Sequence, residues 1–275
     1  MVLRITVENP AGAVKASTQA DDRAILVWDG FYTPGDRIRF TVPEAGKEWR
    51  IRVDDAVEEA QVLLTGTELV YEVPCGDAAL PYNPNAFGAG RHLLTLRAAT
   101  AGEMEAVRNL AANPIDQHDA TDCFPHAHAN AETRGEAVFF ARNAIDGVTA
   151  NTSHGVWPFA TWGNDGRDDA EITVEFGRPV DLEEVALVTR ADFPHDNWWV
   201  NGKLTFSNGI PCSCQWRKAI SRIILRLPST ASNGSSCPTW LRPTIPRRGR
   251  LWYRSKLTVA LPSKSLTGFG RSVSH

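Results

Sequence analysis

An abrupt change in composition after residue 200 decides which part of this chain can be assigned a fold from its sequence pattern. All 32 acidic residues lie within residues 1–200, whereas residues 201–275 contain 13 Lys and Arg and no Asp or Glu. Of the 29 basic residues, 16 therefore lie in the first part, which has a formal charge of -16 against +13 for the rest. Such a step indicates either a basic, nucleic-acid-binding tail or a tail never selected as protein.

The basic tail, residues 210–275, fits a nucleic-acid arm poorly. It mixes Trp216, Trp240 and Trp252 with apolar residues and shows no clean period of 2 or 3.6. We favour a shifted reading frame, because one admissible choice of codons for Cys212 to Arg250 then encodes an acidic segment containing the strand-like run VERLELPDL. This hypothesis predicts that the second domain lacks its final strands, and it makes nucleic acid a partner only if the tail is genuine.

Residues 1–98 are predicted to form an N-terminal β-sandwich domain. The runs RIRFTV (Arg37 to Val42), WRIRV (Trp49 to Val53) and RHLLTLR (Arg91 to Arg97) alternate or cluster apolar residues over strand lengths. Turn signals separate these runs, as in TPGD (Thr33 to Asp36) and YNPN (Tyr82 to Asn85). Nothing in this part has the pattern of a phosphate-binding loop or a nucleophile elbow.

A helical connector is predicted over residues 99–114, followed by a second β-rich domain over 115–209. Thr100 and Glu103 have the spacing of a capping box, and Pro114 closes a helix expected from Ala101 to Ala112. Further on, Ile172, Val174 and Phe176 share one face of a strand, and a Gly-Arg-Pro turn leads to the next strand. The predicted class is therefore all-β, with two β-sandwich domains joined by a short helix.

Several segments of residues 109–209 resemble a known family. In order, they are NLAAN (Asn109 to Asn113), ARNAIDG (Ala141 to Gly147), Trp162, AEITVEFGRPVDLEEVALVTR (Ala170 to Arg190) and LTFSNG (Leu204 to Gly209). They are similar to the discoidin, or coagulation factor 5/8 type C, domain, a galactose-binding-like jelly roll also used by family 32 carbohydrate-binding modules. The chain also resembles a bacterial group of intracellular proteins that carry this domain behind a small β-domain. The resemblance implies carbohydrate binding by loops at one end of the sheets.

The stretch TRADFPHDNWW, Thr189 to Trp199, is the first candidate for such a ligand-binding loop. A sugar has an apolar face and a rim of hydroxyls, so its site needs an aromatic platform beside hydrogen-bonding side chains. That set is Arg190, His195, Asp196, Asn197, Trp198 and Trp199. The alternative is that one tryptophan belongs to the core and that Arg190 and Asp192 form an ion pair. A second loop, Ser153 to Gly163, adds His154 and Trp157 as ligand candidates, whereas Trp162 matches the core tryptophan of the family.

Two groups of residues are candidates for metal binding. By the resemblance, Asp146 is the possible calcium ligand, with further oxygens from Asn151 and Thr152; the alternative is an Asp-Gly turn in which the carboxylate bonds to its own backbone. Zinc is a weaker alternative at Cys123, His126 and His128, because their spacing is not a standard one and a fourth ligand is needed. The default there is a packed loop.

The favoured function is a non-catalytic carbohydrate-binding protein that recognises a sugar or glycoside. The alternatives are an enzyme acting on a sugar, with Glu132, His195 or Asp196 as acid and base, and a protein-interaction module. The beginning of the sequence has no apolar h-region, and no apolar run approaches twenty residues. We therefore expect a cytoplasmic protein without a membrane partner.

Overall fold

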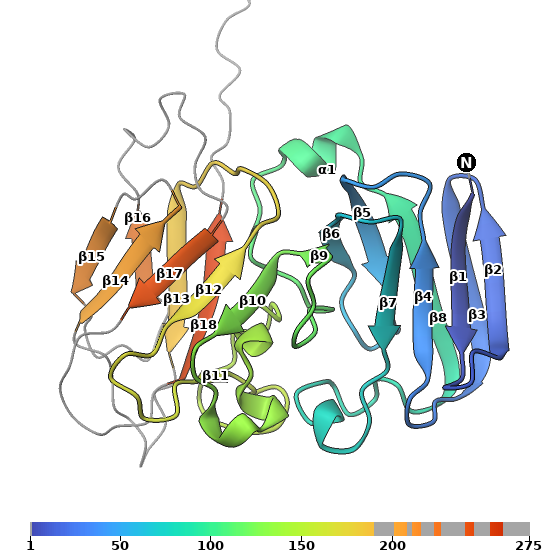
Figure 1. Ribbon diagram of the computed structural model, residues 1–275, viewed down its shortest axis with the longest axis horizontal. Helices are drawn as coiled ribbons and strands as arrows, with labels where there is room; N and C mark the ends of the chain where they lie inside the picture. Colours follow the sequence, from blue (N-terminus) through green and yellow to red (C-terminus); the bar gives the residue numbers. More distant parts are fainter. Residues whose placement is uncertain are drawn as a thin grey trace, which may run out of the picture.

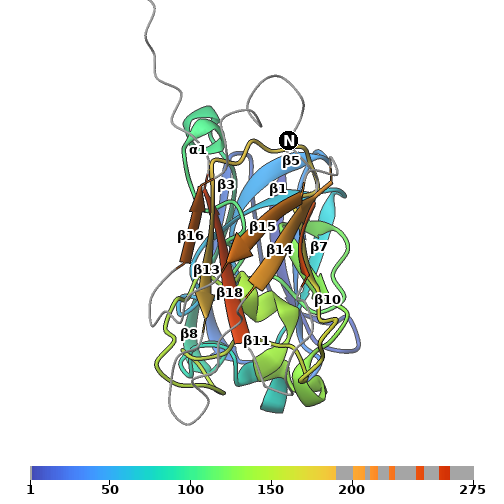
Figure 2. The same ribbon diagram turned by 90° about the vertical axis from the view of Figure 1, so that its left-hand side faces the viewer.

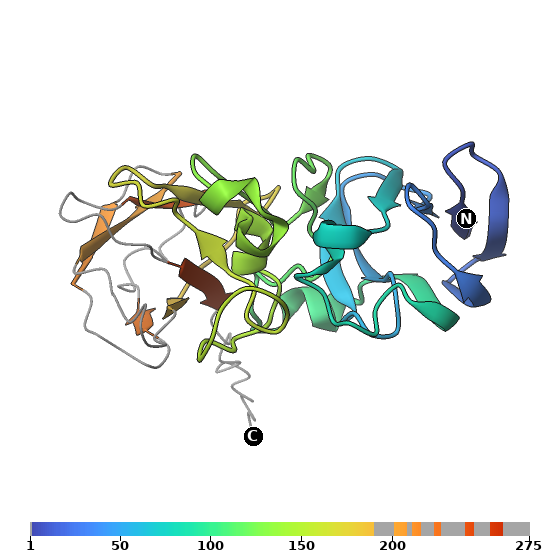
Figure 3. The same ribbon diagram turned by 90° about the horizontal axis from the view of Figure 1, so that it is seen from below.

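Two β-sandwiches lie side by side along the long axis of the molecule (Figures 1 and 3). The computed structural model describes residues 2–189, 201–207, 211–215, 223–226, 240–244 and 254–260, and the side chains of 2–189 and 203–207. The strands pair antiparallel in four sheets, which confirms the predicted all-β class. In the described part, no helix is long and apolar enough to cross a membrane.

The first sandwich is built from strands between residues 3 and 124. One sheet has the order β2-β1-β4-β7 and the other has the order β3-β8-β5-β6-β9. The strands are β1 (Leu3–Glu8), β2 (Val14–Ala20), β3 (Arg23–Phe31), β4 (Arg37–Thr41), β5 (Lys47–Arg52), β6 (Ala60–Leu64), β7 (Glu68–Glu72), β8 (Ala89–Ala98) and β9 (Cys123–Phe124). The three runs predicted as strands here correspond to β4, β5 and β8.

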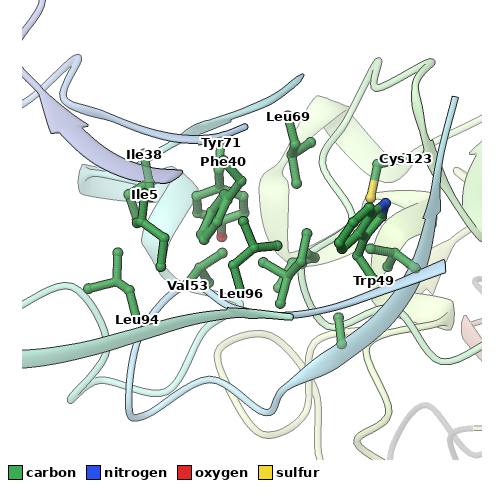
Figure 4. Packing of buried hydrophobic residues seen from close by; sticks show 14 of the residues in the cluster. Ile5, Ile38, Phe40, Trp49, Val53, Leu69, Tyr71, Leu94, Leu96 and Cys123 are labelled. Carbon is green, nitrogen blue, oxygen red and sulfur yellow. The ribbon is translucent and has the colours of Figure 1, made fainter. Parts of the chain in front are cut away.

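The core of the first sandwich lies between its two sheets and follows from alternation along the strands. On β4, Ile38 and Phe40 point inward and are fully buried, whereas the alternating Arg37 and Arg39 point outward. Ile51, Leu94 and Leu96 come from the opposite sheet and complete the packing. Figure 4 shows Leu94 and Leu96 beside Ile38 and Phe40. The predicted turn at Thr33 to Asp36 also forms, since the Asp36 amide donates to the Thr33 carbonyl over 3.0 Å.

The connecting helix is shorter than predicted. Helix α1 (Ala101–Glu105) begins with the expected capping box of Thr100 and Glu103, but it ends at Glu105 instead of continuing to Ala112. Ala106 is extended, and the Asn109 side chain accepts a hydrogen bond from the Ala111 amide. A side-chain acceptor of this kind offers the backbone an alternative to the helix, and the burial of Ala111 in the second core favours that alternative.

The second sandwich also has two sheets, seen along the molecule in Figure 2. Their orders are β10-β12-β17-β14-β15 and β11-β18-β13-β16. The strands before residue 210 are β10 (His126–Ala129), β11 (Trp162–Gly163), β12 (Ile172–Glu175), β13 (Glu184–Thr189) and β14 (Asn201–Phe206). Short 3-10 turns η2 (Thr133–Gly135), η3 (Ala137–Phe139) and η4 (Ala141–Ala144) form the loop end of this sandwich, and η1 (Gly76–Ala79) lies in the first unit.

The basic tail contributes four strands to the second sandwich, and the loss of the native final strands stays a prediction. The four strands are β15 (Pro211–Gln215), β16 (Ile223–Arg226), β17 (Trp240–Thr244) and β18 (Arg254–Ala260). β17 pairs with both β12 and β14, and β18 pairs with both β11 and β13. The side chains of the tail follow no regular period, whereas these strands are defined by backbone pairing with their neighbours. The shifted reading frame concerns the gene and stays a prediction.

The two sandwiches contact each other through β6, β9 and the turn after β12. Leu63 and Leu64 of β6 pair with β9, and β10 of the second sandwich follows β9 directly. Glu48 of the first unit forms an ion pair of 2.5 Å with Arg178 of the second, and its other carboxylate oxygen lies 3.1 Å from Arg108. These contacts bring the loops of the two units together at one end.

Candidate functional site

The first predicted ligand-binding stretch lies outside the described residues. Its candidate residues are Arg190, His195, Asp196, Asn197, Trp198 and Trp199. Asp192, predicted as the ion-pair partner of Arg190, lies outside them too. Their role in ligand binding stays a prediction. The strand before them, β13, ends at Thr189. Its side chains are buried on both faces, whereas a strand with one buried face would alternate buried and exposed side chains.

The second predicted loop, Ser153 to Gly163, packs against the first unit. His154 is exposed and Trp157 is half-buried, and the Trp157 amide donates to the Leu80 carbonyl over 2.9 Å. Trp162, by contrast, is fully buried, and its indole N–H donates to the Ala131 carbonyl over 2.8 Å. The loop thus has a core tryptophan at its end and brings His154 and Trp157 toward the surface beside the first sandwich.

A pocket of about 270 Å³ lies between the two units, next to this loop. One wall comes from the segment that follows β7 and the other from the loop end of the second sandwich. The lining residues are Glu72, Val73, Pro74, Cys75, Ala78, Pro81, Tyr82, Gln117, His118, Ala137, Phe140 and Arg142. Leu80, the partner of Trp157, belongs to the same segment as Ala78, Pro81 and Tyr82, so the loop borders the pocket.

Aromatic rings line part of this pocket. The His118 and Phe140 rings lie 4.2 Å apart between centroids at 31°. The Arg142 guanidinium lies 4.5 Å from the centre of the Tyr82 ring, a cation–π contact that fixes the orientation of both side chains. The pocket therefore combines ring surfaces with polar groups held in defined positions.

The polar groups of the pocket are oriented by hydrogen bonds. His118 is half-exposed, with Nδ1 lying 2.8 Å from Asp119 Oδ2 and Nε2 lying 2.9 Å from Glu132 Oε2. Gln117 pairs with the backbone of Glu72 through both its amide oxygen and its amide nitrogen, at 3.1 and 2.7 Å. These pairings hold the imidazole and the carboxamide at the pocket wall with little freedom to rotate.

Arg142 is the buried cation of the pocket. Its guanidinium donates to the carbonyls of Asp116 and Pro114 and to the side-chain oxygen of Asn143, at distances of 2.6 to 3.0 Å. Burial lowers its pKa, but the tyrosines and carboxylates around it outweigh burial and hold the pKa above its usual value. Arg142 therefore stays charged and ties the loop after Asn113 to η4.

Asp146 was predicted as a calcium ligand, with an Asp-Gly turn as the alternative hypothesis, and the structure contains this turn. The Asp146 side chain is buried, and Oδ1 accepts a hydrogen bond of 2.8 Å from the Val148 amide, while Gly147 has a φ of 84°. Glu58 of the first unit borders this turn, since its carboxylate lies 3.8 Å from where a Cβ on Gly147 would stand. The side-chain amide of Asn151 donates to the Thr189 carbonyl over 3.0 Å. Calcium binding by Asp146, Asn151 and Thr152 stays a prediction.

Cys123, His126 and His128 belong to no cluster of three potential metal ligands in the described part of the chain. Cys123 is buried on β9, where burial raises the pKa of its thiol. His126 lies 2.8 Å from the buried carboxylate of Asp116, and the exposed His128 lies 3.7 Å from Glu175. The arrangement agrees with the packed loop that was the default.

Glu132, a candidate acid or base for the enzyme hypothesis, supports the pocket wall. Its Oε1 accepts a hydrogen bond of 2.7 Å from the Ala141 amide at the start of η4, and its Oε2 faces His118. The sequence prediction missed His118, Phe140 and Tyr82, because the pocket forms only when the two sandwiches pack together. The one signal in the sequence was the density of polar and aromatic residues after Pro114.

Comparisons with known proteins give structural similarities at low identity. No protein-family model matches the chain, and no curated protein matches its sequence. The lectin binding domain of lectinolysin complexed with Lewis b is similar at 11% identity and a TM-score of 0.44, covering 57% of this chain and 99% of that one. A family 32 module from C. perfringens NanJ in complex with galactose has 16% identity and a TM-score of 0.35, covering 49% and 91%.

A third solved structure, a fucose binding module of Streptococcus pneumoniae, has 12% identity and a TM-score of 0.42, covering 56% of this chain and 98% of that one. All three are lectin domains or carbohydrate-binding modules.

Proposed function

We propose that this protein is a non-catalytic carbohydrate-binding protein, and that the pocket between its two sandwiches holds part of the sugar. The observation that carries this proposal is the combination, in one pocket of about 270 Å³, of ring surfaces with hydrogen-bonding groups held in place. A pyranose ring offers C–H groups on its faces and hydroxyls around its rim, and both kinds of group find partners in such a pocket.

The pocket suits a small, neutral ligand. Phe140, Tyr82 and the His118 ring supply ring surface, while the Gln117 carboxamide keeps one N–H and one lone pair for a ligand. The charges that line it, Glu72 and Arg142, are of opposite sign. Binding pockets for small molecules have this composition, mostly apolar with a few positioned polar groups.

The neighbouring loops extend the proposed site beyond the pocket. His154 and Trp157 lie on the loop that bonds to Leu80. The predicted set from Arg190 to Trp199 follows β13 in the same sandwich. An oligosaccharide with one residue in the pocket would place a further residue against the loop of His154 and Trp157.

The experiment is a glycan-binding screen of the full chain, followed by calorimetry with the best ligand on matched histidine variants. His118→Ala removes ring surface from the pocket wall and should weaken binding by about tenfold, or about 1.4 kcal/mol, the upper range for one aromatic contact. His128→Ala, an exposed histidine on β10 that is not part of the pocket, should leave affinity unchanged. Equal affinity in both variants, or no saturable sugar binding at all, contradicts the proposal. Recovery of altered sugar after incubation would favour the enzyme hypothesis instead.

A further inference from the structure

A second cluster of potential ligands lies in the first sandwich, away from the proposed sugar pocket. Asp54 and Asp55 follow β5, and His92 lies on β8. One ligand atom from each of the three lies within 4.8 Å of the others, and in the described part of the chain no other cluster of three or more such residues has this geometry. Ligands that surround one metal ion at 2.0–2.2 Å are separated by distances in this range.

Two buried polar atoms at this cluster have no partner among the described groups. His92 is almost entirely buried, its Nδ1 lies 2.8 Å from Asp54 Oδ2, and its Nε2 has no hydrogen-bond partner among the described groups. The hydroxyl of Tyr32, whose ring centroid lies 4.7 Å from that of His92, is buried and unpartnered as well. Buried polar atoms without partners are uncommon in folded proteins and indicate an unseen water or ion.

The electrostatic field at this cluster is negative. Three carboxylates, those of Asp36, Asp54 and Asp55, lie near the Tyr32 hydroxyl. Lys15 pairs with Asp36 over 2.5 Å, so this lysine compensates that carboxylate. Asp54 accepts hydrogen bonds from the Ala56 and Phe87 amides, which orient its carboxylate without neutralising it. A cation at the cluster would balance the remaining charge.

An ion can reach the cluster from solvent. Asp55 is exposed and lines an open groove of about 490 Å³ on the first sandwich, together with Arg50, Arg52, Glu58 and Glu59. The cluster therefore has one ligand on the groove side, Asp55, and two buried ligands, Asp54 and His92, on the protein side.

We propose that Asp54, Asp55 and His92 bind a divalent transition-metal ion, with Tyr32 beside it. The imidazole nitrogen selects the class of ion, because calcium and magnesium prefer all-oxygen ligand sets, whereas two carboxylates and one imidazole suit first-row transition metals. In the bound form the ion takes the place of the hydrogen between His92 Nδ1 and Asp54 Oδ2, so both atoms become ligands, and the hydrogen moves to Nε2 of the neutral imidazole.

The test uses Mn²⁺, which disfavours thiolates and so avoids the cysteines of the chain. Binding of Mn²⁺ to the full chain is measured by the loss of its free-ion electron paramagnetic resonance signal. We expect one ion per chain, and Asp55→Asn should weaken binding by about tenfold or more, since it removes an exposed ligand without disturbing the core. Asp181→Asn removes an exposed carboxylate of the second sandwich and should leave binding unchanged.

One further variant and a competition with Ca²⁺ separate this site from other ones. Asp146→Asn should not change Mn²⁺ binding, because Asp146 belongs to the turn in the second sandwich. Excess Ca²⁺ should fail to displace Mn²⁺ from a site with a nitrogen ligand. Absence of Mn²⁺ binding, equal binding in Asp55→Asn and Asp181→Asn, or ready displacement by Ca²⁺ would each overturn the proposal.

Discussion

His126 and Asp116 form a buried pair that links the segment after the helical connector to β10. Nδ1 of His126 lies 2.8 Å from Asp116 Oδ1, and the Ala127 amide donates to Asp116 Oδ2 over 3.0 Å. Burial disfavours the charged imidazole, but the hydrogen bond and charge of Asp116 outweigh burial and hold the pKa of His126 above its usual value. The pair therefore makes stability depend on pH.

The direction of this dependence follows from the raised pKa. Protonated His126 stabilises the folded state, so its contribution is complete below the unfolded pKa of about 6.5 and is lost as the pH rises through the higher folded value. We expect His126→Asn, which keeps a hydrogen-bond donor but cannot titrate, to lose this part of the pH dependence. Urea unfolding of both proteins from about pH 5.5 to about pH 8.5 measures it. Identical pH profiles of the two proteins would contradict the prediction.

At the scale of elements, the turn after β12 and the β6–β9 pair form a close contact between the two sandwiches. Gly177 has a φ of 66°, and a Cβ there would stand 2.6 Å from the Phe124 ring and 3.0 Å from Leu63. Only glycine fits both the backbone conformation and the space. This contact, with the ion pairs of Glu48, joins the first sandwich to the turn after β12.

Gly177→Ala should destabilise the protein more than Gly166→Ala does. Gly166 has a similar φ of 69° but nothing within 4 Å of its added Cβ, so the two variants share the backbone strain and differ in the clash. We expect about 1–2 kcal/mol from the left-handed backbone in each, and about 1–3 kcal/mol more for Gly177→Ala from overpacking. Denaturant unfolding gives the difference. Equal losses of unfolding free energy in the two variants would mean that the interface accommodates the added Cβ of Gly177→Ala without destabilisation.

At the scale of the whole molecule, the second sandwich depends on the basic tail. β17 lies between β12 and β14, and β18 lies between β11 and β13, so both sheets of this sandwich include a tail strand in an interior position. Without these strands, β12, β13 and β14 would each have an unpaired edge. Unpaired edges with exposed core promote aggregation.

A chain ended after residue 209 should therefore lose the cooperative unfolding of the second sandwich while the first sandwich stays folded. A chain ended after Ala260 keeps every described strand and is the matched control. Limited proteolysis and unfolding monitored by tryptophan fluorescence compare the two chains, and soluble yield should fall for the shorter one. If the chain ended at 209 unfolds in the same way as the control, the tail strands contribute nothing to the fold.

The sequence by itself determined the local features of this protein. Alternation of Ile38 and Phe40 with outward arginines and the capping box at Thr100 depend on near neighbours and on the balance of apolar and polar residues along a strand or turn. The burial of Trp162 was expected from the family resemblance. Such patterns are sufficient for the all-β class and for two sandwiches, because each strand must bury one face.

Only the tertiary structure decided the sites. The pocket walls at Tyr82 and Phe140 come from different sandwiches, and Asp54 and His92 are 38 positions apart in the chain. The end of the helix at Glu105 and the pairing of the tail strands depend in the same way on distant partners. A local pattern carries no information on which distant segments will pack together, since that choice is made by the packing free energy of the whole fold.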